Sequence, residues 1–262
     1  MSAHALEARL RAVQCEERTA LLPYLMAGFP SKRAFAELLV EVAARADVVE
    51  LGLPFSDPTA DGPVLAAAAR RALAEGVHLA WVCELVRSLR AELDVGLVLM
   101  SYLNPLLAPG LERALESLAR ARFDGLIVPD VPLEESAELD ERARAHGLAR
   151  IHLVTPLSSP ARRRALARAS RGFLYAVTRT GTTGPRTDPA ETVDYLRELR
   201  AFSPLPVCAG FGLSTPEHVR ALAPHCDGVV VGSALTELLA LGRDPLPLLD
   251  ALREAALARA PR

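Results

Sequence analysis

The segment from Val49 to Pro63, VELGLPFSDPTADGP, contains two carboxylates whose setting suggests acid–base chemistry. Glu50 stands inside an apolar, strand-like run, where an unpaired charge is costly. Two turn signals follow, and the second of them, Asp61-Gly62-Pro63, begins with an acid. A strand that ends in an acid and opens into a polar loop is how a barrel enzyme presents catalytic groups. Glu50 and Asp61 are therefore candidate catalytic residues.

Each acid also has a purely structural interpretation. Glu50 would be the buried ion-pair partner of one of the many arginines. Asp61 would be the N-cap of a helix that has Pro63 in its first turn. Either acid alone is more often structural than catalytic, but the two together in this context favour chemistry.

Two glycine-rich turns near the end of the chain suggest a phosphate site. Gly210-Phe211-Gly212 follows one apolar run, and Gly232-Ser233 follows the next and opens a helix. Glycines let backbone N–H groups approach an anion, and a helix N-terminus favours negative charge. Each turn alone would be an ordinary tight connection, but the pair favours phosphate binding. The Thr- and Gly-rich loop 178–188 is either a lid over the site or an ordinary surface loop.

Other reaction types have little support in the sequence. Lys32, the only lysine, stands at the polar start of a predicted helix, which is a poor setting for a Schiff base. The six histidines show no metal-ligand spacing, so we expect no metal site. The four cysteines form no CxxC pair and are expected to be reduced packing residues.

Short apolar runs alternate with helical patterns along the whole chain, which predicts a single (β/α)8 barrel over residues 1–262. A doubly wound sheet is less favoured because no GxGxxG follows the first strand. Leu6, Leu10 and Val13 predict an extra N-terminal helix on the lower face of the barrel. Helical patterns include Ala34–Ala46 and Pro160–Ala169. The predicted strands are Leu21–Met26, Val48–Leu51, Gly96–Ser101, Gly125–Val128, Ile151–Val154, Phe173–Val177, Pro206–Ala209 and Gly228–Val231.

The composition limits the class of protein. Half of the 262 residues are hydrophobic, the formal net charge is −2 and the pI is near 6.3. This balance gives no sign of a nucleic-acid surface. No apolar run approaches the roughly 20 residues that cross a bilayer, and the N-terminus lacks a signal-peptide pattern. We expect a cytoplasmic protein that binds neither nucleic acid nor membrane.

The motifs together resemble the tryptophan synthase alpha subunit family. The resemblance runs through PYLMAGFP, VELGLPFSDPTADGP, VPDVPLEES, RTGTTG, AGFG and VGSAL, in order and at matching intervals over nearly the whole chain. Two positions depart from the usual pattern: Thr182 stands where Val is more usual, and Tyr24 stands where Phe occurs. Neither departure removes a reacting group.

The resemblance implies an enzyme, a carbon–carbon lyase that splits indole-3-glycerol phosphate into indole and glyceraldehyde 3-phosphate. By the same resemblance, Glu50 would be the general acid–base residue, and Asp61 would bond the indole N–H. Substrate contacts would come from Tyr175, Leu99, Ile127, Tyr102 and Thr183. The phosphate would lie against Gly184, Phe211, Gly212, Gly232 and Ser233.

The resemblance further implies no cofactor in this chain and a beta subunit as partner, in an α2β2 assembly whose beta subunit holds pyridoxal phosphate. Three alternatives stay open at this point: a free-standing lyase for the same substrate, another phosphate-binding barrel such as an isomerase, and a non-catalytic activating subunit.

Overall fold

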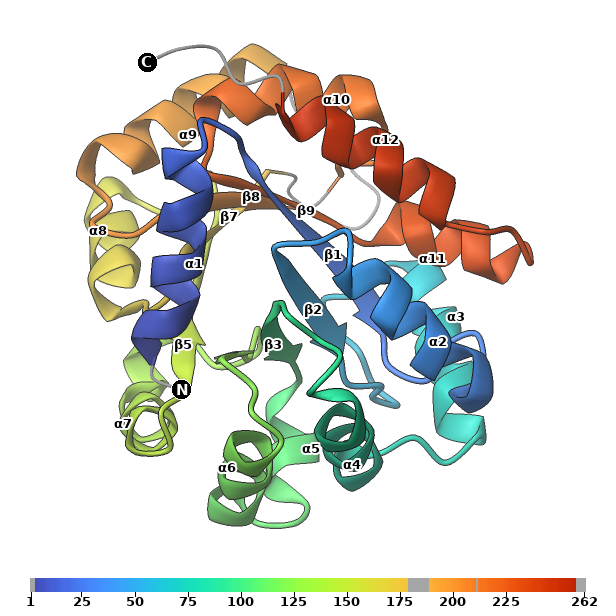
Figure 1. The fold of residues 1–262 in the computed structure, drawn as a ribbon. Coiled ribbons are helices and arrows are strands. Elements are labelled where there is room, and N and C mark those ends of the chain that lie inside the picture. Colours follow the sequence, from blue (N-terminus) through green and yellow to red (C-terminus); the bar gives the residue numbers. More distant parts are fainter. Residues whose placement is uncertain (1–2, 179–188, 211, 258–262) are drawn as a thin grey trace.

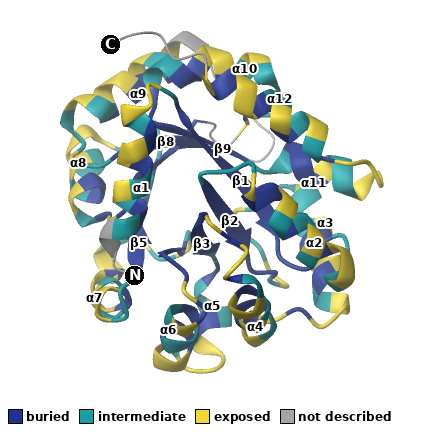
Figure 2. Cartoon of the chain, in the orientation of Figure 1, coloured by how far each residue is buried: buried dark blue, intermediate teal, exposed yellow. Residues whose placement is uncertain are grey.

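The computed structural model describes residues 3–178, 189–210 and 212–257. Its strands are short and almost entirely buried (Figure 2). They are β1 (Ala20–Met26), β2 (Val48–Gly52), β3 (Gly96–Met100), β4 (Gly125–Ile127), β5 (Ala149–Ile151), β6 (Leu153–Val154), β7 (Leu174–Val177), β8 (Val207–Gly210) and β9 (Gly228–Val231).

These nine strands form one parallel sheet in the order β5-β4-β3-β2-β1-β9-β8-β7-β6. β5 and β6 stand at the two ends of that order, yet only His152 separates them in the sequence. The sheet therefore closes on itself, and the helices surround the ring of strands (Figure 1). The predicted (β/α)8 barrel is confirmed.

The helices match the predicted alternation, with additional helices between some strands. No helix in the described part of the chain is long and apolar enough to cross a bilayer. The helices are α1 (Ala3–Cys15), α2 (Lys32–Ala43), α3 (Pro63–Ala74), α4 (Leu79–Leu89), α5 (Leu103–Leu107), α6 (Leu111–Arg120), α7 (Ala137–Ala145), α8 (Pro160–Ala169), α9 (Pro189–Phe202), α10 (Pro216–Leu222), α11 (Ser233–Ala240) and α12 (Leu246–Leu257), with 3₁₀ turns η1 (Leu133–Glu135) and η2 (Ala223–His225).

The predicted strands agree with the observed ones to within one residue, except for the fifth. The prediction of one strand over Ile151–Val154 is wrong, because the chain forms two short strands that are interrupted at His152. β5 pairs only with β4, and β6 pairs only with β7. The strand is divided because its two halves join opposite edges of the sheet where the barrel closes.

Side chains from the strands fill two apolar layers. One layer lies inside the barrel and includes Tyr24, Val98 and Tyr175. The other lies between the barrel and the surrounding helices and includes Leu51 and Leu99. Because successive residues of a strand face opposite sides, neighbours in sequence belong to different layers.

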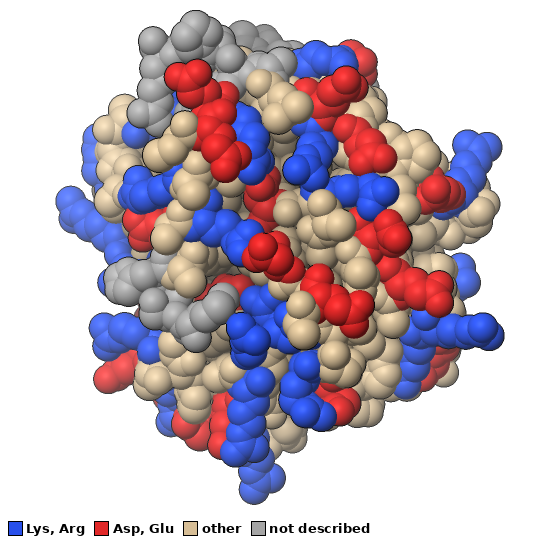
Figure 3. All heavy atoms as spheres, viewed as in Figure 1, with Lys and Arg blue, Asp and Glu red and all other residues tan. Residues whose placement is uncertain are grey.

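Helix α1 covers the end of the barrel at which the strands begin, as predicted. In Figure 1 it crosses in front of the ring of strands. Leu6 is almost fully buried, and a Cβ atom added at Gly96 or Gly172 would lie 3.1 or 2.9 Å from its side chain. These glycines therefore leave room for Leu6. On the same face, basic and acidic side chains are interspersed over the surface (Figure 3).

Candidate active site

A cavity of about 970 Å³ opens where the barrel strands end, opposite the end covered by α1. Residues near the ends of the strands and in the loops that follow them line its wall. The predicted residues that line it are Glu50, Asp61, Tyr175, Gly212, Gly232 and Ser233. Three other predicted residues, Thr183, Gly184 and Phe211, lie outside the described residues, as does most of the loop 178–188.

Glu50 is a buried carboxyl without a partner. Its exposed fraction is 2%, and neither carboxyl oxygen has a hydrogen-bond partner among the residues that the structure describes. By contrast, the buried Asp124 accepts a 2.9 Å bond from the Leu97 N–H and lies 3.4 Å from Arg90. The interpretation of Glu50 as an ion-pair partner is therefore wrong. Burial raises the pKa of Glu50 to about 8, because no positive charge or donor offsets the loss of water.

Asp61 lies on the loop between β2 and α3, at the edge of the cavity. The N-cap of α3 is Gly62, with Pro63 as the first helical residue, and no side chain caps this helix. The interpretation of Asp61 as the N-cap is therefore wrong, because the helix begins one residue too late for it. Burial raises the pKa of Asp61, while a hydrogen bond with Tyr102 acts in the opposite direction.

Tyr102 holds the loop that contains Asp61. Its hydroxyl accepts a 2.9 Å hydrogen bond from the Ala60 N–H, and its ring centroid lies 5.3 Å from that of Phe55. Tyr102 is buried and is not among the residues lining the cavity. Burial raises its pKa to about 12, so the hydroxyl keeps its proton and can donate it to Asp61 in a hydrogen bond. The geometry favours contact with Asp61 over the predicted contact with substrate.

The side chains of two tyrosines extend over glycines on the neighbouring strand. Tyr24 pairs in register with Glu50, and a Cβ added at Gly52 would lie 1.9 Å from the Tyr24 hydroxyl oxygen. Tyr175 pairs with Cys208 of β8, and a Cβ added at Gly210 would lie 2.4 Å from the Tyr175 hydroxyl oxygen. Each hydroxyl thus occupies space that a larger residue would fill. Tyr24 lines the cavity, although the sequence pattern gave it no role.

The predicted apolar contacts lie elsewhere. Leu99 is in the outer layer, between the barrel and the helices, and does not line the cavity. Its neighbour Met100 does line it, because side chains alternate along β3 and Met100 faces inward. Ile127 pairs with Met100 and lies in the inner layer, but it too is absent from the cavity wall. Met100 therefore replaces Leu99 as the apolar candidate on β3.

The glycine-rich turns reach the cavity at the ends of β8 and β9. Gly212 has a φ of +84°, which glycine adopts without strain. Gly232 precedes α11, and a Cβ at this position would lie 2.9 Å from Cβ of Tyr24. Ser233 is the first residue of α11, whose first N–H groups lack partners within the helix. This arrangement is suited to an anion.

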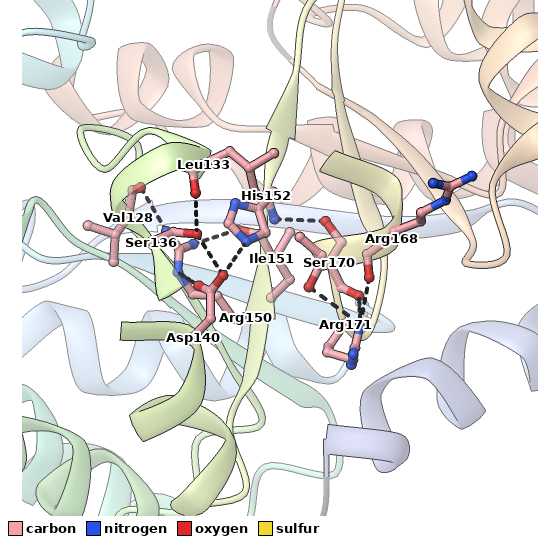
Figure 4. A network of polar contacts seen from close by, with 11 residues as sticks. Val128, Leu133, Ser136, Asp140, Arg150, Ile151, His152, Arg168, Ser170 and Arg171 are labelled. Carbon is pink, nitrogen blue, oxygen red and sulfur yellow. Dashed lines mark hydrogen bonds and ion pairs between the residues drawn. The ribbon is translucent and has the colours of Figure 1, made fainter. Parts of the chain in front are cut away.

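A polar network at the barrel closure was not anticipated from the sequence (Figure 4). Arg150 and His152 are both buried, and they approach the two oxygens of Asp140 at 3.2 and 3.0 Å. The backbone N–H of His152 also donates to the Ser170 hydroxyl at 3.1 Å. Burial lowers the pKa of Arg150 to about 10. Burial by itself would raise the pKa of Asp140. Hydrogen bonds from His152 and Ser136 and the nearby charge of Arg150 have the larger combined effect, so the pKa of Asp140 is lowered.

This network joins α7 to β5 and to His152 at the break between β5 and β6. Arg150 also donates to the carbonyl oxygens of Ile151 and Val128, at 2.7 and 3.2 Å. A sign of this network was present in the sequence, because Arg150 and His152 stand at alternate positions of the apolar run ARIHLV. Arg150 and His152 also line the cavity.

The fold and the cavity define a (β/α)8-barrel protein with a buried glutamate and a partly buried aspartate near the carboxyl ends of its strands. The family model for the tryptophan synthase alpha chain matches residues 10–253. The chain therefore belongs to the tryptophan synthase alpha chain family.

Individual relatives agree with this assignment. The tryptophan synthase alpha chain of Nitratidesulfovibrio vulgaris strain DP4 is 44% identical over 97% of this chain and 100% of its own length. The tryptophan synthase alpha chain of Deinococcus radiodurans is 40% identical over 94% of this chain and 92% of its own length. The crystal structure of tryptophan synthase subunit alpha from Legionella pneumophila superposes with a TM-score of 0.88 at 32% identity, covering 98% of both chains. A structure of Mycobacterium tuberculosis tryptophan synthase superposes with a TM-score of 0.88 at 33% identity. The match covers 96% of this chain and 97% of that chain.

Proposed function

We propose that this chain is a carbon–carbon lyase that cleaves indole-3-glycerol phosphate to indole and glyceraldehyde 3-phosphate. The observation that supports this most directly is Glu50. A carboxyl with a pKa of about 8 is mostly protonated at neutral pH, and Glu50 lines the cavity without a competing partner. It is therefore available to donate a proton to a bound substrate.

The proposed reaction needs proton transfer in both directions. Indole leaves as a carbon acid, so its C3 atom is protonated first, and Glu50 supplies that proton. The resulting Glu50 carboxylate then accepts the proton of the glycerol hydroxyl as the C–C bond breaks. Asp61 accepts a hydrogen bond from the indole N–H and stabilises the positive charge that develops on the ring. Tyr102 keeps Asp61 in place for this contact.

The remaining cavity residues would bind the rest of the substrate. Met100 and Tyr175 lie on the cavity wall and would flank the indole ring and position it. Gly212, Gly232 and Ser233 would receive the phosphate through backbone N–H groups and the serine hydroxyl. The family resemblance adds Thr183, Gly184 and Phe211 to the proposed substrate and phosphate contacts. Ile127 would support the indole region from the inner layer.

The product indole suggests the partner. Indole is small and apolar, so it diffuses away unless a partner consumes it where it forms. We propose a beta subunit docked at the cavity mouth in an α2β2 complex, with pyridoxal phosphate held only by that subunit. The exposed Asp57 and its neighbour Pro58 lie on the loop that leads to Asp61, so docking there would order the site.

A single domain over 1–262 and a cytoplasmic location stay predictions.

An assay of indole release tests the proposal. The purified chain is incubated with indole-3-glycerol phosphate, with and without a matched beta subunit, beside the Glu50→Gln variant. We expect release by the wild type, faster release with the partner, and almost none from the variant. Release that is equal in wild type and variant would refute the role of Glu50. No release under any condition would favour a non-catalytic subunit.

A further inference from the structure

Tyr24 places a hydroxyl group at the wall of the cavity. Tyr24 has an exposed fraction of 6% and lines the cavity. Within the described residues its hydroxyl makes no hydrogen bond. Because the rest of Tyr24 is buried and its side chain lines the cavity, the hydroxyl is available to a partner inside the cavity.

The strand register places Tyr24 beside Glu50. Tyr24 and Glu50 are register partners on adjacent parallel strands, so their side chains face the same side of the sheet. The Tyr24 oxygen occupies the space that a side chain at position 52 would fill. Positions 50 and 52 are successive inward-facing positions of β2. The hydroxyl therefore lies one inward position beyond Glu50, toward the mouth of the cavity, and Gly52 places no side chain between them.

Two groups without hydrogen-bond partners thus lie on the same face of neighbouring strands. The Glu50 carboxyl has no donor, and the Tyr24 hydroxyl has no acceptor. Asp61 is the other acid near Tyr24, but it already has a hydrogen bond with Tyr102. Glu50 is therefore the acid that lacks a donor. This need is greatest when Glu50 is ionised, because a buried carboxylate without a donor is far more costly than a neutral carboxyl.

We propose that Tyr24 is a positioning residue whose hydroxyl donates a hydrogen bond to the Glu50 carboxylate once Glu50 has given its proton to the substrate. The second half of this statement rests on the proposed function. As the Glu50 O–H bond breaks, a C–H bond forms at C3 of the indole. The phenol O–H bond of Tyr24 stays intact throughout. The carboxylate then takes the glycerol hydroxyl proton, the C–C bond breaks, and its electron pair returns to the indole ring.

The other titratable groups around Glu50 do not replace this donor. Tyr175 on β7 and Cys208 on β8 face it across the barrel, and burial raises the pKa of both well above their ordinary values. Burial does the same to Tyr24, and the Asp61 and Glu50 charges raise its pKa further. All three groups therefore stay neutral near pH 8. No arginine, lysine or histidine in the described residues pairs with Glu50.

The test is a direct titration of Glu50 in the full-length, ligand-free chain. The carboxyl band is followed by infrared difference spectroscopy and assigned by its loss in Glu50→Gln. We expect Tyr24→Phe to move the titration midpoint to higher pH by about one unit, which corresponds to about a tenfold change in ionisation. Tyr195→Phe is the matched control, because Tyr195 is equally buried but donates to the Val154 carbonyl oxygen at 2.8 Å, on another side of the fold. It should leave the midpoint unchanged.

An unchanged midpoint in Tyr24→Phe would overturn the proposal, and so would a shift produced by Tyr175→Phe alone. Steady-state kinetics give an independent readout. We expect Tyr24→Phe to lower kcat about tenfold with KM within about twofold, and to move the alkaline limb of the pH profile upward. A raised KM with unchanged kcat would indicate substrate packing and contradict the proposal. If the wild type does not cleave indole-3-glycerol phosphate, the proposed function fails, but the titration still decides the role of Tyr24.

Discussion

Replacing Glu50 by Gln should make the ligand-free chain more stable at alkaline pH while it removes catalytic activity. The reason is the raised pKa of this carboxyl, from an ordinary value of 4.5 to about 8, which burial causes. Between those two pH values the folded chain holds a proton on Glu50 that the unfolded chain has lost. The free energy of unfolding therefore falls as the pH rises through this window and is constant above it.

The size of the effect follows from the gap of about 3.5 pH units between the two pKa values. At about 1.4 kcal/mol per unit, ionisable Glu50 costs about 5 kcal/mol of stability above pH 8 and about 3 kcal/mol at pH 7. The Gln variant has no such titration. Its amide carries a pH-independent cost of about 1–3 kcal/mol if it finds no hydrogen bond. The quantity to compare is therefore the slope with pH and not the stability at one pH.

Urea unfolding of both proteins at several pH values from 5 to 9 measures this slope. The free energy of unfolding of the variant, relative to that of the wild type, should rise by about 1.4 kcal/mol per pH unit up to pH 8. Glu37→Gln, an exposed position on α2, is the control and should follow the wild type. Cleavage by Glu50→Gln should fall by about 10²–10⁴-fold. Parallel stability curves for wild type and variant would refute the reasoning, because they would show that ionised Glu50 is stabilised in the fold.

The other site residues give further predictions. Asp61→Asn should lower the cleavage rate about 100-fold or more by removing the negative charge opposite the indole N–H, with little change in melting temperature because Gly62 caps α3; full activity would contradict this. Ser233→Ala should weaken glycerol phosphate binding a few-fold. Gly212→Leu should weaken it further, and it should also lower stability because position 212 has a positive φ. Unchanged affinity of both variants in calorimetry would refute the phosphate site. Substitution of Asp57 or Pro58 should reduce activation by a matched beta subunit more than basal cleavage, as measured by rates with and without that subunit, and equal losses would contradict docking at this loop.

The sequence was sufficient to predict the order and type of the elements. Parallel strands covered on both faces appear as short apolar runs, and the intervening amphipathic segments appear as helices, so the alternation alone indicated a barrel. It also predicted that α1 covers the lower face. The candidate acids were visible because a carboxylate in an apolar run, or in a loop after it, is unusual whatever the tertiary structure. The motif resemblance identified the family because it depends only on residue types and their order along the chain.

Which residue faces the cavity was decided only by the tertiary structure. When both faces of a strand are apolar, the sequence does not show which alternate residues point inward, so Leu99 was preferred to Met100. The break at His152 depends on where the sheet closes, and closure is a property of all the strands together. The phase of side chains and the closure of the barrel are long-range consequences that no local pattern contains.

The pairing of polar groups was likewise settled in three dimensions. The sequence allowed Glu50 to pair with any of many arginines, and only the packed barrel shows that none of the described ones reaches it. The Tyr24 hydroxyl and Gly52 are 28 positions apart in the chain, yet strand register brings them together. Sequence therefore determined which chemical groups this protein has and on which elements they lie. Tertiary structure decided which groups are desolvated and which have partners, and those two conditions set the pKa values on which the chemistry depends.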